Sequence, residues 1–351
     1  MNITNIKYFS IDCSDNEPVY CIESDTNVRI GLMAFGAAIA FVCTPDKEGA
    51  VKNIALSLQD YKDYSSSNTY AGATVGPVAG RIRNGLLPIG GKTYSLPRND
   101  GANTLHSGPD NLGNTLWKVQ NTFFNNDEAG IVFTQHLYDG QSGFPGERDL
   151  AVRYALSRDN TLTIQYTATT DKVTWLNMTN HTYWNLTGDF TKPADNQILM
   201  INADKVYYND AEHLPVSCED TAGTPFDFAV PRAVADAIQS NPSHGQLRNA
   251  LGYNNAYLLH KDREIAAVLS DPLSGRRITI ETDYPSLVFY SGGYLGNGAN
   301  TVDNQKIASG SAYALEAQYL PDAPNLQGED TPFLVPGETY DNTISIHFDS
   351  I

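Results

Sequence analysis

One stretch of the chain, residues 175–189, gathers side chains of the types that can bind and transform a sugar. It reads WLNMTNHTYWNLTGD, which places amide groups and one imidazole among broad aromatic faces. A sugar offers hydroxyl groups at its rim and C–H groups on its faces, so amides beside aromatic rings suit it. His181 stands at the centre with Tyr183 close by, and an imidazole titrates near neutral pH. A single histidine among aromatic residues is more often structural than catalytic, so this stretch alone favours a structural histidine.

A carboxylate, two arginines and a second histidine elsewhere in the chain could complete such a site. Glu316 lies in the otherwise uncharged run ALEAQYL, where partial burial would raise its pKa and its basicity. Arg81 and Arg83 lie in GPVAGRIRNG, a segment whose glycines let the backbone approach a ligand closely. His106 ends the loop-like segment NDGANTLH. Taken one at a time, Glu316 is more typical of an exposed strand face, and Arg81 and Arg83 are more typical of a solvated turn.

The elements that must position these residues are short strands, separated by Gly, Pro and Asn. Residues 149–156 and 161–168 alternate apolar and polar residues around SRDN, which predicts an antiparallel hairpin. We expect helix only within 232–251, and a polar loop over 61–67. Because no region alternates strands with long helices, a parallel α/β sheet is disfavoured. We predict an all-β fold, a large antiparallel β-sandwich with little helix. No linker-like segment interrupts it, so we expect a single domain over 1–351.

The charge balance narrows the classes of partner. Lys and Arg number 23 against 40 Asp and Glu, for a formal net charge of −17. Nucleic acid and anionic membrane surfaces would be repelled, so we expect a small neutral substrate, with no nucleic-acid or membrane partner. No secretory leader pattern or membrane-spanning run is visible in the sequence. The chain is expected to act as a monomer or a homodimer.

The number and spacing of the cysteines bear on the cellular compartment in which the protein works. The chain has four cysteines, Cys13, Cys21, Cys43 and Cys218, which are few and unevenly spaced for a disulfide framework. None of them forms a Cys-x-x-Cys pair that would suggest a metal site. We interpret them as free thiols in a reducing, cytoplasmic environment, and we expect no metal and no cofactor.

Eight segments, in order along nearly the whole chain, resemble the aldose 1-epimerases, or galactose mutarotases. They are VRIGLMAFGA, PDKEG, RIRNG, NDGANTLHSG, SGFPG, TNHTYWNL, TPFDF and LEAQYLPDAPN. The resemblance implies a galactose mutarotase-like supersandwich with a sugar site in a cleft on one concave face. It also implies an isomerase of carbohydrate metabolism that interconverts the α and β anomers of a free aldose, such as galactose or glucose, without a cofactor.

The resemblance also assigns roles to residues. In the family, the residue that matches Glu316 is the general base, and the residue that matches His181 is the general acid. The residues that match Arg81 and His106 hold the sugar. Mutarotation needs one proton taken from the anomeric hydroxyl and another given to the ring oxygen, and a carboxylate and an imidazole suit these two transfers. We add the neighbouring Tyr183 to the predicted sugar-binding set.

Two positions depart from the family pattern. Asn254 stands where the family usually has an Asp that contacts sugar hydroxyls, and Val288 stands where a Gln is common. An amide still forms hydrogen bonds, whereas Val288 forms none, so we predict Asn254 as a sugar contact. The preferred sugar is expected to differ from galactose.

Two other functions remain open from the sequence. A carbohydrate-binding protein of the same fold that has lost the reaction would retain the site without catalysis. A glycoside hydrolase would need a second carboxylate near Glu316, for which Asp189 and Asp322 are candidates by their places in the sequence.

Overall fold

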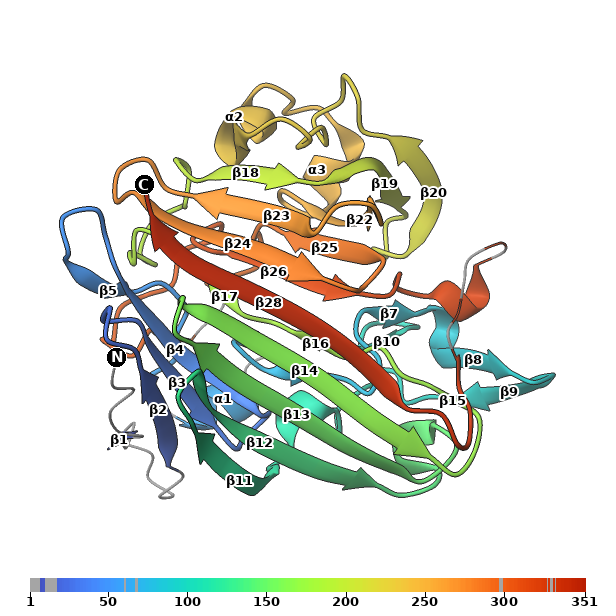
Figure 1. Ribbon diagram of the computed structural model, residues 1–351. Helices are drawn as coiled ribbons and strands as arrows, with labels where there is room; N and C mark the ends of the chain where they lie inside the picture. Colours follow the sequence, from blue (N-terminus) through green and yellow to red (C-terminus); the bar gives the residue numbers. More distant parts are fainter. Residues whose placement is uncertain are drawn as a thin grey trace.

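The computed structural model describes residues 7–9, 18–59, 61–66, 69–296, 299–326, 328, 331 and 333–351. Over these residues the strands form two large sheets and a smaller one, with little helix (Figure 1). Strand pairs in all three sheets are antiparallel. The predicted all-β antiparallel sandwich is confirmed.

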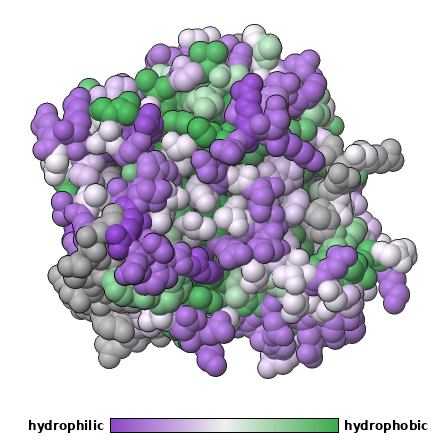
Figure 2. Space-filling model, viewed as in Figure 1, coloured by the Kyte–Doolittle hydropathy of each residue, from purple (hydrophilic) through white to green (hydrophobic). Residues whose placement is uncertain are grey.

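The largest sheet has nine strands in the described part of the chain. In spatial order they are β11 (Lys118–Phe124), β12 (Glu128–Leu137), β13 (Arg148–Ser157), β14 (Thr161–Thr170), β28 (Tyr340–Ser350), β24 (Arg276–Thr282), β23 (Ile265–Ser270), β18 (Ile198–Ile201) and β21 (Arg232–Ala233). The predicted hairpin is β13 with β14, where Tyr154 pairs with Ile164. Alternate residues of β14, including Leu162, Ile164 and Tyr166, are fully buried. On the face seen in Figure 2, hydrophilic residues are interspersed with hydrophobic ones.

The second large sheet has six strands within the described residues. They are β17 (Tyr183–Trp184), β26 (Tyr313–Gln318), β25 (Ser286–Tyr290), β22 (Asn254–Leu259), β19 (Ala203–Asn209) and β20 (Pro215–Asp220). It lies behind β28 and β24 in the view of Figure 1. Leu287 and Phe289 of β25 share one core cluster with Ile164 and Phe348 of the nine-stranded sheet. One face of the six-stranded sheet therefore packs into the core.

The remaining elements surround these two sheets. The third sheet contains β1 (Lys7–Phe9), β2 (Val19–Glu23), β3 (Arg29–Met33), β4 (Ala38–Pro45) and β5 (Val51–Asn53). Short ribbons pair β6 (Thr74–Val75) with β16 (Thr179–Asn180), β7 (Arg81–Ile82) with β10 (Thr104–Leu105), β8 (Leu86–Ile89) with β9 (Lys92–Ser95), and β15 (Thr174–Trp175) with β27 (Phe333–Leu334). Single 3₁₀ turns are η1 (Arg83–Gly85), η2 (Leu112–Asn114), η3 (Gln141–Gly143) and η4 (Ala323–Asn325).

The helices are short. The region expected to contain helix holds α2 (Val234–Gln239) and α3 (Gly245–Asn249). The expectation of a loop over 61–67 is wrong, because α1 spans Tyr61–Ser66. Its Tyr64 is buried in the core, and the hydroxyl of Tyr64 accepts a hydrogen bond from Leu58 N at 3.1 Å. Tertiary packing thus overrides the weak local propensity of this polar segment.

Two further observations concern the cysteines and the membrane. Cys43 carries a free thiol, and Cys13 lies outside the described residues. Among the helices that the structure describes, none is both long enough and apolar enough to cross a membrane.

Candidate active site

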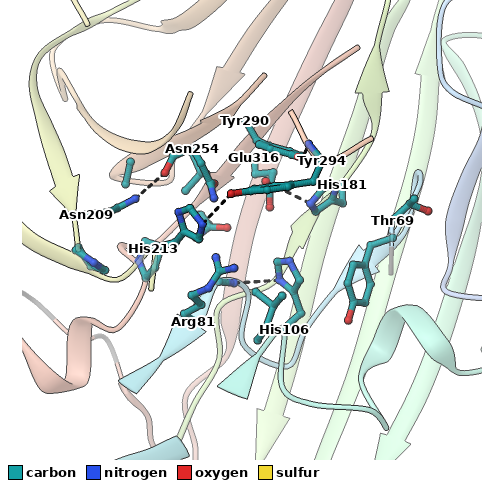
Figure 3. Close-up of a pocket in the computed structure, with 18 of the residues that line it drawn as sticks. Thr69, Arg81, His106, His181, Asn209, His213, Asn254, Tyr290, Tyr294 and Glu316 are labelled. Carbon is teal, nitrogen blue, oxygen red and sulfur yellow. Dashed lines mark hydrogen bonds and ion pairs between the residues drawn. The ribbon is translucent and has the colours of Figure 1, made fainter. Parts of the chain in front are cut away.

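A cavity lies against the six-stranded sheet, on the face opposite the core (Figure 3). Its volume is about 180 Å³, which is small beside the range of roughly 300–1,000 Å³ typical of small-molecule sites. Every site residue predicted from the sequence lines it: Arg81, His106, His181, Tyr183, Asn254 and Glu316. Residues from distant parts of the chain are thus brought together around a space suited to one small ligand.

The floor of the cavity follows from the two-residue period of the strands. Ala256, Val288 and Glu316 lie opposite one another across β22, β25 and β26, and each lines the cavity. Their neighbours along the strands, including Leu287 and Leu315, point into the core. Since successive side chains of a strand point to opposite faces, the sequence of β26 that buries Leu315 necessarily presents Glu316 to the cavity.

His181 and Glu316 face each other in this cavity. The distance from His181 Nε2 to Glu316 Oε1 is 3.5 Å, and the two side chains are 6% and 5% exposed. His181 lies in the short connection between β16 and β17, where its backbone N–H donates to Ala73 O at 2.9 Å. Its carbonyl accepts from Gly72 N at 3.0 Å. Both backbone groups are therefore held by one segment, which fixes the imidazole over β26.

The amides around His181 have a different role from the one that their composition suggests. Asn180 Oδ1 accepts from the backbone N and Oγ1 of Thr182, which stabilises the turn that carries His181. Asn177 exchanges two hydrogen bonds with the backbone of Tyr319, at 2.8 and 3.0 Å. Asn185 Nδ2 donates to Ser311 O at 2.6 Å. These amides hold the backbone, whereas His181 and Tyr183 line the cavity.

Burial governs the electrostatics of the reactive pair. Removal from water raises the pKa of Glu316 to about 8, an effect that the positive charge of Arg81 partly offsets. Burial lowers the pKa of His181 to about 4, with a smaller opposing effect from its own backbone. At neutral pH these two shifts therefore favour a neutral carboxylic acid beside a neutral imidazole. In this form the pair holds one titratable proton, on the carboxyl group. A carboxylate beside an imidazolium holds the same number, so moving that one proton converts one form into the other.

Arg81 and His106 come from the paired strands β7 and β10 and their edges. Arg81 Nε donates to Asp100 Oδ2 at 2.7 Å, which orients the guanidinium along the cavity wall. Gly80 N donates to His106 Nδ1 at 3.1 Å, so this nitrogen must carry the lone pair. Burial, with His181 and Arg81 nearby, holds the pKa of His106 well below its usual range. A neutral His106 then bears its proton on Nε2 and acts as a hydrogen-bond donor.

Asn254 and Tyr183 complete the predicted set. Asn254 begins β22, and its backbone carbonyl accepts from Asn209 Nδ2 at 2.6 Å. Its own amide lines the cavity. The ring of Tyr183 lies 4.9 Å from the ring of His181, at an interplanar angle of 52°. An aromatic ring and an amide thus line the cavity together with the reactive pair.

Several lining residues were not predicted from the sequence: Thr69, Tyr70, Asn209, His213, Tyr290, Tyr294 and Gln318. Strand parity could have found two of them, because Tyr290 shares a face with Val288 and Gln318 shares a face with Glu316. His213 and Tyr294 lie in turns, where no periodicity indicates the direction of a side chain.

The carboxylates considered for a hydrolase lie outside the cavity lining. Asp189 Oδ1 accepts from Thr191, and Asp189 Oδ2 pairs with Lys192 at 2.9 Å. Asp322 is fully buried and accepts from the backbone N of Arg83 at 2.9 Å. Among the described residues that line the cavity, Glu316 is the single carboxylate. Glycoside hydrolysis uses two carboxylates, and the described lining of this cavity supplies only one.

Comparisons with known proteins point to one family. The family model described as aldose 1-epimerase matches residues 18–347. The aldose 1-epimerase of Escherichia coli K12 is 31% identical over 342 residues, covering 95% of this chain and 96% of that protein. The galactose mutarotase of Rattus norvegicus is 30% identical over 323 residues, covering 92% of this chain and 91% of that protein.

Solved structures show the same similarity. An aldose epimerase homologue from C. elegans superposes with a TM-score of 0.87 at 26% identity, covering 95% of this chain and 99% of that one. A galactose 1-epimerase from Lactobacillus acidophilus superposes with a TM-score of 0.83 at 29% identity, covering 95% of each chain.

Proposed function

The chain belongs to the aldose 1-epimerase family and is a mutarotase, an isomerase of sugar anomers, and from this premise we propose that Glu316 is its general base and His181 its general acid. The observation that carries the assignment is the contact between the two side chains, 3.5 Å apart and almost fully buried in one cavity. Arg81, His106, Asn254 and Tyr183 are proposed to hold the sugar against this pair.

The proposed reaction balances two protons. The carboxylate of Glu316 takes the proton of the anomeric hydroxyl, whose O–H electrons form the C1=O1 double bond. The bond between C1 and the ring oxygen breaks, and the ring oxygen receives a proton from His181 Nε2. Rotation about C1–C2 exposes the other face of the aldehyde. Ring closure returns the proton of the ring oxygen to His181 and the proton of Glu316 to O1.

Burial favours the protonation states of the ring-opened intermediate in this reaction. Once the ring has opened, Glu316 is a neutral acid and His181 is a neutral imidazole, which are the forms that the desolvated cavity favours. The starting charges can form by moving the single proton of the pair from Glu316 to His181 over their 3.5 Å contact. The positive charge of Arg81 favours this transfer, since it lowers the pKa of Glu316.

Polarimetry on freshly dissolved α-D-glucose and α-D-galactose tests the function and the base together. The unmodified protein should accelerate the approach to anomeric equilibrium, and Glu316→Gln should lower kcat by roughly 10²- to 10⁴-fold. Glu281→Gln makes the same chemical change at an exposed site on β24, and it should leave the rate unchanged. Full activity of Glu316→Gln would refute the assigned base.

Other features are proposed with the same premise. We propose one domain over 1–351, acting as a monomer or a homodimer on a small sugar in the cytoplasm. The family match over 18–347 supports the single domain, and the free thiol of Cys43 supports a reducing compartment. Asn254 and Val288 in the cavity support a preferred sugar other than galactose. Comparing kcat/KM for galactose, glucose and L-arabinose tests that preference, and a clear preference for galactose would refute it.

A further inference from the structure

Tyr294 and His213 belong to separate loops and meet at the cavity described above (Figure 3). Tyr294 Oη lies 3.2 Å from His213 Nε2 and 2.8 Å from the backbone oxygen of Asn249. A carbonyl oxygen only accepts, so the single hydroxyl proton of Tyr294 goes to Asn249. His213 Nε2–H must then donate to Tyr294 Oη. We call His213 and Tyr294 the rim bridge.

The rim bridge joins three segments that are far apart in the sequence. His213 lies in the turn between β19 and β20, Tyr294 follows β25, and Asn249 ends α3. Figure 3 shows His213 on the side of the cavity away from His181. His213 thus lies across the cavity from the acid of the proposed reaction, and Tyr294 extends toward it from the side of Glu316 and His181.

Exposure places the rim bridge at the solvent end of the cavity. Tyr294 is 44% exposed and His213 is half-buried. Glu316 and Val288, on the floor, are only 4% and 8% exposed. A group attached to a bound sugar at its solvent end would therefore meet the bridge before it reached open water.

Each end of the bridge is held by its own backbone contacts. Asp210 Oδ1 accepts from Glu212 N at 2.9 Å and from Leu214 N at 3.1 Å, which fixes the turn around His213. Arg83 Nη2 donates to the other oxygen of Asp210 at 3.1 Å and ties this turn to the Arg81 segment. These contacts favour a preformed wall.

The other half of the bridge is equally supported. Tyr294 N donates to Tyr290 Oη at 2.7 Å, and the rings of Tyr290 and Tyr294 stack with an interplanar angle of 23°. Tyr290 belongs to the floor strand β25. Displacing Tyr294 would therefore break its hydrogen bonds and disturb a residue that lines the site.

We propose that the rim bridge restricts the substrate to a free monosaccharide, by filling the space into which a second sugar unit would extend. This inference rests on the proposed mutarotase function and narrows its substrate class. A glycosidically linked second unit would have to displace the Tyr294 ring and break its two hydroxyl hydrogen bonds, with Asn249 and His213. The cavity volume of about 180 Å³ is also small beside the range of roughly 300–1,000 Å³ typical of small-molecule sites.

Two substitutions at Tyr294 separate its ring from its hydroxyl. Tyr294→Phe removes both hydrogen bonds and keeps the ring, whereas Tyr294→Ala opens the rim. We compare kcat/KM for glucose with kcat/KM for maltose, a disaccharide whose reducing unit also mutarotates. The unmodified protein should favour glucose by about tenfold or more. Tyr294→Ala should reduce this preference at least several-fold, chiefly through a lower KM for maltose, and Tyr294→Phe should have a smaller effect.

A second tyrosine beside a histidine supplies a matched control. Tyr138 is 67% exposed, and its ring lies 4.8 Å from the ring of His136, outside the residues that line the cavity. Tyr138→Ala should leave both rates unchanged. A preference for glucose that Tyr294→Ala does not reduce would overturn the proposal, and so would equal activity of the unmodified protein on both sugars.

Calorimetric binding distinguishes failure of the inference from failure of the function. Glucose and maltose are titrated into Glu316→Gln, with and without Tyr294→Ala. If the unmodified protein accelerates the mutarotation of no sugar, the proposed function fails. The ratio of the binding constants for glucose and maltose still shows whether the rim bridge restricts the ligand. A ratio that Tyr294→Ala shifts toward maltose supports the bridge. An unchanged ratio, or no binding of either sugar, overturns it.

Discussion

Val288 lies directly opposite Glu316 in the antiparallel register of β25 and β26, on the face that lines the cavity. The neighbour of the proposed base is therefore an aliphatic side chain that is itself 92% buried, since only 8% of Val288 is exposed. Val288 can form no hydrogen bond with the carboxylate, and it helps to keep water away from it. This pairing accounts in part for the burial that raises the pKa of Glu316 to about 8.

The titration of the reactive pair predicts a bell-shaped dependence of kcat/KM on pH. Below about pH 4, His181 takes up a proton while Glu316 is still protonated, so the pair holds two protons and lacks a base. Above about pH 8, Glu316 loses its proton while His181 is neutral, so the pair lacks an acid. The rate should be highest between these limits, and the two apparent pKa values belong to the coupled pair. Polarimetry across pH 3–10 checks this, and a rate that rises steadily above pH 8 would contradict it.

Substituting Val288 should shift the alkaline limb of the pH profile, which is the fall in rate as Glu316 loses its proton. Val288→Thr keeps nearly the same shape and adds a hydroxyl group that can donate to the carboxylate of Glu316. Stabilising the ionised form lowers the pKa of Glu316, so the alkaline limb should move to lower pH by about one unit. Val288→Ile, which stays apolar, should leave the limb in place. The idea fails if both variants shift the limb equally.

Arg81 is predicted to act through both its charge and its shape. Arg81→Lys keeps the charge but loses the planar fork and the Nε contact with Asp100, so KM should rise about tenfold with the alkaline limb unchanged. Arg81→Met also removes the positive charge that lowers the pKa of Glu316. In that variant the alkaline limb should move to higher pH. Complete pH profiles of both variants provide the measurement, and identical limbs would argue against the electrostatic role.

Much of this architecture follows from local sequence signals. Alternation in 149–168 predicts the β13–β14 hairpin, because a half-buried strand has a period of two. The order of short motifs indicates the family and with it the positions of Glu316 and His181. These signals succeed because each depends on residues that are close together in the chain.

The remaining features depend on contacts between distant residues. The sequence suggests a ligand as the partner of Asn177, yet its partner is the backbone of Tyr319, 142 positions away. His213 and Tyr294 are 81 positions apart and lie in turns, so no pattern brings them together before the sheets assemble. The apolar neighbour of Glu316 likewise becomes visible only when the register of β25 and β26 is known.

Tyr154 is predicted to position His181 from beneath the cavity. Its hydroxyl donates to Ala37 O at 2.7 Å and accepts from Asn180 Nδ2 at 3.4 Å, and Asn180 directly precedes His181. Tyr154→Phe leaves a buried carbonyl without this donor, so the free energy of unfolding should fall by about 1–3 kcal/mol. Because the turn that carries His181 loosens as well, kcat should fall several-fold while KM changes little.

A second buried tyrosine separates positioning from general destabilisation. Tyr313 is 3% exposed, and its hydroxyl donates to Ala194 O at 2.7 Å rather than bonding to Asn180. Tyr313→Phe should therefore lose similar stability in urea denaturation and retain its kcat. If the two variants lose kcat to the same extent at equal stability, the link from Tyr154 through Asn180 to His181 is wrong, and the loss reflects the weakened core alone.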